Sequence, residues 1–169
     1  MVDCVTKGQK MEKEYTNLEA EIAGLGMFVG EYVHNLDPKK RLTIPSVWRS
    51  QVGKPKSVYV LPDFHHPCLN VFPAAEMAHR LEKLRRHSMA DRQARQFARV
   101  LGESSDLLSW DSQGRIRIKD KLLDFAGLQE RVVLVGALDR FELWNPDYRE
   151  EAGALDQERL EEAARYVGF

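Results

Sequence analysis

The chain contains an internal duplication, and this repeat limits the folds open to it more than any other feature. Residues 37–61 match residues 111–135 at a constant offset of 74. The offset then drops to 72, so that residues 69–72 correspond to residues 141–144, because the first copy has a loop two residues longer. A repeat of this kind indicates two structurally equivalent units.

Each copy predicts the order strand, turn, strand, short helix, strand, turn, strand. In the second copy Ile116 and Ile118 alternate with arginines, a pattern typical of a half-buried strand. Further strands are expected at residues 57–61 and 131–135, each after a glycine. One such unit has too small an apolar face to be stable alone. We therefore expect an α+β fold in which the second copy, or another chain, covers the first.

Two helices are expected between the copies. The first begins at Pro73, and the second has Ser88 in a capping box and stops at Gly102. Apolar residues at helical spacing support both helices: Met77, Leu81 and Leu84, then Ala94, Phe97, Ala98 and Leu101. These elements divide the chain into five segments: an N-terminal extension (1–26), unit 1 (31–76), a helical linker (77–103), unit 2 (105–148) and a helical tail (149–169).

The two ends of the chain predict further helix. Apolar residues recur at steps of four and three from Met11 to Leu25, as in a short heptad stripe. This stripe is compatible with a helix docked on its own chain, with a coiled coil, or with partial disorder. At the other end Asn145 followed by proline can cap a helix, which Gly153 would interrupt.

The composition excludes several classes of protein. No apolar stretch approaches the roughly 20 residues of a membrane span, and the N-terminus lacks the apolar core of a secretory signal. We therefore expect a cytoplasmic protein without a membrane partner. Cys4 and Cys68 are far apart, which indicates neither a disulfide framework nor a structural zinc site.

The sequence offers no positive case for catalysis. No GxSxG, HExxH, Walker or GxGxxG motif is present. His65, His66 and Cys68 are metal-ligand residue types, but their spacing is unsuitable, so a structural loop is favoured over a metal site. We expect no cofactor, no metal and no small-molecule substrate.

The duplicated turn is the best candidate for a functional site. Asp37 precedes Arg41 by four residues, and Asp111 precedes Arg115 by four. An aspartate that opens a turn accepts hydrogen bonds from backbone amides further on and so fixes the loop. An arginine held there can form a bidentate contact with guanine or phosphate. The alternative is a surface hairpin in which each aspartate only pairs with its own arginine. Repetition at equivalent positions favours a shared binding role.

Several motifs together resemble the MraZ family of bacterial proteins, which belongs to the SpoVT-AbrB superfamily. These are the two turns in LDPKKRLTIP and DSQGRIRI, HHPCLNVFPAAEM between them, and the closing AGLQERVVLVGALDRFELW. The resemblance covers residues 27–148. It implies tandem AbrB-like β-barrel units of the swapped-hairpin type, forming one pseudo-symmetric domain. It also implies a nucleoid-associated regulator of the division and cell-wall genes that acts as a ring-like homo-oligomer on promoter DNA.

The resemblance implies DNA-binding residues in both turns. The family's glycine before the arginine is retained as Gly114, whereas Lys40 replaces it in the first turn. If that position needs a positive φ, Lys40 is strained by about 1 kcal/mol, or the first loop takes another shape. Both possibilities stay open for the first turn, and we expect Arg41 and Arg115 to contribute unequally to DNA binding, because only the second turn has the glycine. The residues predicted to contact double-stranded DNA are Asp37, Lys39, Lys40, Arg41, Asp111, Gly114, Arg115, Arg117 and Lys119.

The near-neutral net charge of −1 hides an uneven distribution of charge. Residues 27–100 contain thirteen basic and six acidic residues, and residues 145–169 contain three basic and seven acidic ones. Focused basic loops therefore remain compatible with DNA binding. A second hypothesis is an oligomeric scaffold or antitoxin-like module whose C-terminal helices bind another protein. The weakest is an enzyme that uses His65, His66 or Cys68.

Overall fold

The computed structural model describes residues 26–88, 91–153 and 156–169. The predicted α+β class is confirmed. The strands are β1 (Glu31–Asn35), β2 (Arg41–Thr43), β3 (Ser57–Pro62), β4 (Cys68–Pro73), β5 (Asp106–Ser109), β6 (Arg115–Arg117), β7 (Arg131–Gly136) and β8 (Phe141–Trp144). The helices are α2 (Ser46–Gln51), α3 (Ala74–Ser88), α4 (Arg92–Ser104), α5 (Asp120–Phe125), α6 (Pro146–Ala152) and α7 (Gln157–Val167). Each predicted strand named above lies within about a residue of an observed one.

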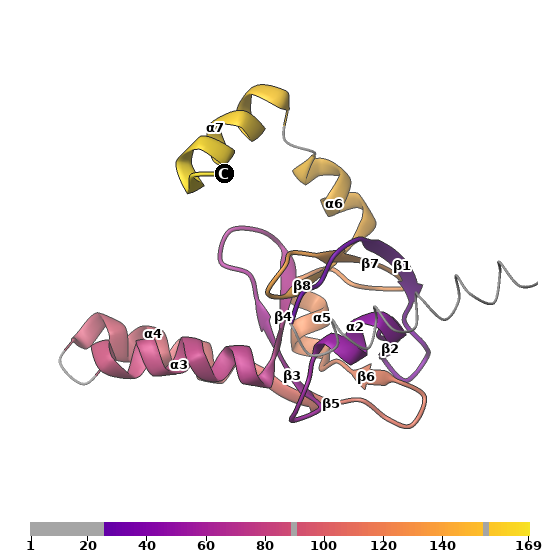
Figure 1. Ribbon diagram of the computed structural model, residues 1–169. Helices are drawn as coiled ribbons and strands as arrows, with labels where there is room; N and C mark the ends of the chain where they lie inside the picture. The colour runs from indigo at the N-terminus through magenta and orange to yellow at the C-terminus, as the bar shows by residue number, and fades with distance from the viewer. Residues whose placement is uncertain (1–25, 89–90, 154–155) are drawn as a thin grey trace, which may run out of the picture.

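The strands form a six-stranded antiparallel sheet of order β1-β7-β8-β4-β3-β5 and a separate pair, β2 with β6. The helical hairpin α3–α4 projects from one side of this sheet, whereas the turns before β2 and β6 lie on the opposite side (Figure 1). Helices α6 and α7 extend from a third side. The turns are therefore separated both from the α3–α4 hairpin and from α6 and α7.

The two copies are interlocked rather than side by side. β1 of the first copy pairs with β7 of the second, and β5 of the second pairs with β3 of the first. In the short pair, Leu42 of β2 lies opposite Ile116 of β6, the residue at the same position in the other copy. The chain therefore has a pseudo-two-fold arrangement, and the second copy supplies the cover that the first one lacks.

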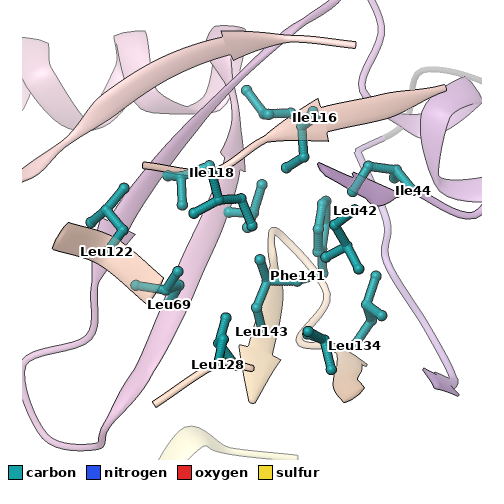
Figure 2. Close-up of a cluster of buried hydrophobic side chains, with 14 of the residues drawn as sticks. Leu42, Ile44, Leu69, Ile116, Ile118, Leu122, Leu128, Leu134, Phe141 and Leu143 are labelled. Atoms are coloured by element: carbon teal, nitrogen blue, oxygen red, sulfur yellow. The ribbon is translucent and has the colours of Figure 1, made fainter. Parts of the chain in front are cut away.

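The main hydrophobic core lies between the copies. Leu42 and Ile44 of the first copy and Ile116 and Ile118 of the second are all at most 1% exposed, as the alternation of apolar residues in these strands predicts. They converge with leucines from β4, β7, β8 and α5 (Figure 2). The ring of Trp48 packs at 4.9 Å from that of Phe141, which joins α2 to β8. Each copy therefore contributes only part of this core.

Both predicted starts of the linker helices need correction. α3 begins at Ala74, because Pro73 is still the last residue of β4. α4 is capped by Asp91, whose side chain accepts a hydrogen bond from the backbone N–H of Gln93 at 2.8 Å. Ser88 does not cap it, because the α3 helix extends to that residue. α4 also continues through Gly102 to Ser104, since one glycine destabilises a helix by only about 1 kcal/mol.

The C-terminal prediction is confirmed in its two local features. The Asn145 side chain accepts a hydrogen bond from the N–H of Asp147 at 2.8 Å and so caps α6. Gly153, with φ of 68°, ends that helix. The predicted stripe from Met11 to Leu25 lies outside the described residues. In the part of the chain that the structure describes, no helix is long and apolar enough to cross a membrane.

Candidate nucleic-acid interface

The two turns have the same hydrogen-bonded geometry. In the first, Oδ1 of Asp37 accepts the backbone N–H groups of Lys39 at 2.8 Å and Arg41 at 2.9 Å. In the second, Oδ1 of Asp111 accepts hydrogen bonds from the backbone N–H groups of Gln113 at 2.9 Å and Arg115 at 3.0 Å, the two equivalent positions. The predicted role of the aspartates in fixing the loops is therefore confirmed.

The residue before each arginine has a left-handed conformation. φ is 75° at Gly114 and 61° at Lys40. In both turns the N–H of this residue donates to the backbone oxygen of the aspartate at 2.9 Å. Of the two possibilities that the sequence left open for Lys40, the structure therefore shows the strained backbone and not another loop shape. Lys40 adopts the same backbone as Gly114, at the steric penalty expected for a residue with a Cβ.

The arginines and aspartates of both turns form one cluster. Within the turns, Nε of Arg41 lies 2.6 Å from Oδ2 of Asp37, and Nη2 of Arg115 lies 2.7 Å from Oδ2 of Asp111. Between the turns, Nη1 of each arginine lies 3.9 Å from the aspartate of the other copy. The surface pairing that the sequence left open thus exists. The cluster also joins turns that lie 74 residues apart in the sequence and orients both guanidinium groups. The side chain of Arg41 remains 28% exposed and that of Arg115 remains 23% exposed.

Both carboxylates are held in the charged form. The hydrogen bonds from the side chain and the backbone of Arg115 lower the pKa of Asp111 to about 2. Desolvation raises the pKa of Asp37, but hydrogen bonds from Arg41 and Lys39 outweigh it, so the net shift is downward. The cluster therefore keeps two anions and two cations at neutral pH.

Acid should weaken the fold through these carboxylates. The pKa of Asp111 is about 2 in the folded chain against an ordinary value of 3.8, so the unfolded state binds more protons between these values. The stability that this group contributes is present above about pH 4 and is lost as the pH falls toward about 2. Urea unfolding at several pH values should show that the free energy of unfolding falls less steeply in this window for Asp111→Asn than for the wild type. An identical pH dependence in the variant would contradict this role.

Substitutions at the left-handed position should have opposite effects in the two turns. Gly114→Ala should lower the free energy of unfolding by about 1–2 kcal/mol, because a Cβ is disfavoured at this φ. Lys40→Gly should raise it by less than about 1 kcal/mol, since the relieved strain is offset by the entropy of the unfolded chain. Urea unfolding monitored by circular dichroism measures both. If Lys40→Gly lowers the free energy of unfolding, the left-handed backbone of Lys40 is not strained.

The remaining predicted site residues do not all join the cluster. Lys39 and Lys40 are exposed in the first turn, and the side chain of Arg117 donates to the backbone oxygen of Lys39 at 3.3 Å. Lys119 instead lies at the start of α5, where its ammonium group is 2.8 Å from Oδ1 of Asp106. The turns and Arg117 thus form one surface, and Lys119 is tied to β5.

Sequence reasoning missed Arg49 of α2, which lies against the second turn. A Cβ on Gly114 would come within 2.7 Å of Nε of Arg49, so the guanidinium group covers this glycine. Nothing in the repeat indicates this role, because the residue equivalent to Arg49 is Leu123, which is buried in the core. The contact arises only when α2 of one copy packs beside the turn of the other.

The histidines and the cysteine of the β3–β4 loop have separate surroundings. The ring of His66 packs at 5.6 Å from that of Trp144. Cys68 is 1% exposed, and burial together with the nearby Glu142 raises the pKa of its thiol to about 12. The backbone N–H groups of His65 and His66 both donate to Asp63 at 2.8 Å. This is the arrangement of a structural loop.

The comparisons with known proteins agree with the resemblance in the sequence. Residues 27–100 and 105–164 match a family model described as MraZ protein, with the words putative antitoxin-like added. A relative from Clostridium tetani is 31% identical over 145 residues, which cover 85% of this chain and all of the relative. One from Halothermothrix orenii is 36% identical over 140 residues, covering 82% and 94%, and one from Finegoldia magna is 34% identical over 125 residues, covering 74% and 85%.

These relatives define a class of transcriptional regulators, since each of the three is named "Transcriptional regulator MraZ". The chain belongs to the MraZ family. This is a family of regulators and not of enzymes, so the hypothesis of an enzyme built on the β3–β4 loop is set aside.

Proposed function

We propose that the protein is a sequence-specific DNA-binding transcriptional regulator that reads the major groove with its two turns. The observation that carries the proposal is the cluster of Arg41 and Arg115 with Asp37 and Asp111. The carboxylates fix both guanidinium groups side by side at one exposed edge, and a preoriented guanidinium loses little entropy when it binds guanine or phosphate. The names of the relatives support a regulatory role.

Neighbouring cations extend this surface. Lys39, Lys40 and Arg117 surround the cluster and would contact phosphates on either side of the groove. Lys119 is assigned the same role at the margin of the surface, where its pairing with Asp106 would have to be exchanged for a phosphate. The expected partner is therefore double-stranded DNA.

The proposal includes the architecture and assembly implied by the family. The crossed pairing of β1 with β7 and of β5 with β3 supports the interpretation as two AbrB-like, swapped-hairpin units in one domain. The division of the chain into an extension (1–26), unit 1 (31–76), a linker (77–103), unit 2 (105–148) and a tail (149–169) is part of this proposal. A ring-like homo-oligomer in the cytoplasm, associated with the nucleoid, would place several such surfaces on repeated promoter sites, and linked weak contacts would give avidity. Occupation of a promoter would repress the division and cell-wall genes, including the protein's own gene.

A binding titration tests this function. Fluorescence anisotropy should show that the full chain binds a duplex from the region upstream of its own gene at least about a hundredfold more tightly than a shuffled duplex of equal length, at about 150 mM salt. Equal affinity for both duplexes would contradict sequence-specific recognition. Weaker binding with rising salt is expected for both.

A second candidate function is binding of another protein by the C-terminal helix. α7 has no buried residue, and it exposes Leu160 by 51%, Tyr166 by 91% and Val167 by 71%. An apolar surface of this kind favours a protein partner. Deletion of residues 156–169 should leave DNA binding by each subunit intact, and salt should not weaken an interface of this type.

A further inference from the structure

A basic pocket lies beside the second turn. It is open, has a volume of about 500 Å³, and lies between α2, the segment after it, and the residue that precedes the turn. Its lining residues are Ser46, Arg49, Ser50, Gly53, Lys54, Lys56 and Trp110. This lining contains three cations and two hydroxyl groups but no carboxylate, so it favours an anion.

Arg49 connects this pocket to the cluster. Its guanidinium group lies over Gly114, next to Arg115 in the chain. Nε of Arg49 is buried and has no hydrogen-bond partner among the residues that the structure describes. Lys54 and Lys56 are exposed and extend the positive surface away from the turn. An anionic chain that contacts the second turn could therefore continue along this pocket.

The positions equivalent to the pocket lining in the second copy do not repeat its basic character. The repeat relates the two serines and Lys56 to Asp120, Asp124 and Glu130, and it relates Arg49 and Lys54 to leucines. The three acidic side chains are exposed. The pocket positions thus carry three cations in one copy and three carboxylates in the other. The backbone keeps its pseudo-two-fold arrangement, whereas the charge reverses, so the two sides cannot bind phosphate equally.

We propose that Arg49, Lys54 and Lys56 form a site for phosphates of the DNA backbone beside the second turn only. The site makes the interface asymmetric: DNA that enters at the cluster is held more strongly on the α2 side than on the α5 side, where Asp120, Asp124 and Glu130 counteract Lys119 and Lys121. Each subunit therefore favours one orientation on the duplex. This inference rests on the proposed function and adds to it the residues that set the direction of binding.

The test compares two variants of the full chain with the same change of charge. Lys54→Ala/Lys56→Ala removes two cations of the pocket, and Lys83→Ala/Arg92→Ala removes two exposed cations of the α3–α4 hairpin, on the opposite side of the molecule (Figure 1). Affinity for the upstream duplex and the shuffled duplex is measured between about 50 and 200 mM salt, the range in which phosphate binding changes steeply. Unchanged urea unfolding shows that the exposed positions leave the fold intact.

The pocket variant should bind both duplexes about tenfold more weakly, because phosphate contacts do not depend on sequence. Its plot of log Kd against log salt should be less steep by about 2, since each phosphate that the protein no longer neutralises lowers the slope by about 0.9. The control should stay within about twofold of wild type. A pocket variant that equals the control overturns the phosphate site. If the wild type prefers the upstream duplex in that experiment, the proposed function stands; if it shows no preference, sequence-specific recognition fails while the salt slope still decides the pocket.

Discussion

Arg41→Ala/Arg115→Ala is expected to weaken binding to the upstream duplex by between about 30-fold and 25,000-fold at about 150 mM salt. A well-placed arginine–guanine pair contributes roughly 1–3 kcal/mol, and two such pairs account for this range. The cluster explains why the contribution should be large. Each guanidinium is held by an aspartate at 2.7 Å or less, so little rotamer entropy remains to be lost when DNA binds. Binding to a shuffled duplex should change much less, because the lysines still bind the DNA backbone.

Arg41→Lys/Arg115→Lys is the matched control for charge. Lysine keeps the cation but cannot form the planar bidentate contact, so this variant should remain nearly as weak as the alanine variant. If lysine restores wild-type affinity, the arginines act on phosphates rather than on bases. Unfolding experiments are needed beside both variants, since removal of the arginines leaves Asp37 and Asp111 without their ion pairs. A folded alanine double variant with wild-type affinity would show that the turns do not read the groove.

Local features of this chain could be predicted because residues close in sequence determine them. An aspartate two to four residues before the amides it binds fixes each turn, and Asp37 and Asp111 indicate this from the sequence alone. Alternation in β6 predicts that Ile116 and Ile118 are buried, and the repeat transfers that expectation to Leu42 and Ile44. The sequence left open whether Lys40 is strained or the first turn takes another shape. The hydrogen bonds of the turn impose the left-handed backbone on Lys40 as well, so the strained alternative is confirmed.

Features that arise between the copies could not be predicted. The contact of Arg49 with Gly114 depends on the packing of α2 beside the turn of the other copy. The ion pairs that join the two turns depend on the register that places Leu42 opposite Ile116. Linear patterns do not specify such a register. The cap of α4 is a different case, because both Ser88 and Asp91 suit an N-cap and the length of α3 decides between them.

Separation of the chain between its two copies should abolish the fold of each half. Fragments 1–90 and 91–169 each keep one hairpin, β3–β4 or β7–β8, and each loses the pairings of β1 with β7, β2 with β6, β3 with β5 and β4 with β8. The main core is divided as well, so Leu42 and Ile116 would both be exposed. As a monomer, neither fragment should show cooperative urea unfolding or slow amide exchange.

An equimolar mixture of the two fragments should recover the fold, because every pairing broken by cleavage can form again between the fragments. The expected signs are a cooperative transition, protected amides in β2 and β6, and a complex that weakens on dilution as an intermolecular equilibrium requires. A fragment can also pair with a second copy of itself, since the pseudo-two-fold relation makes its own strands similar to the missing ones. Such a homodimer is concentration-dependent too. Cooperative folding of either fragment as a monomer would contradict the interlocked core, because it would mean that one copy buries its apolar face without the other.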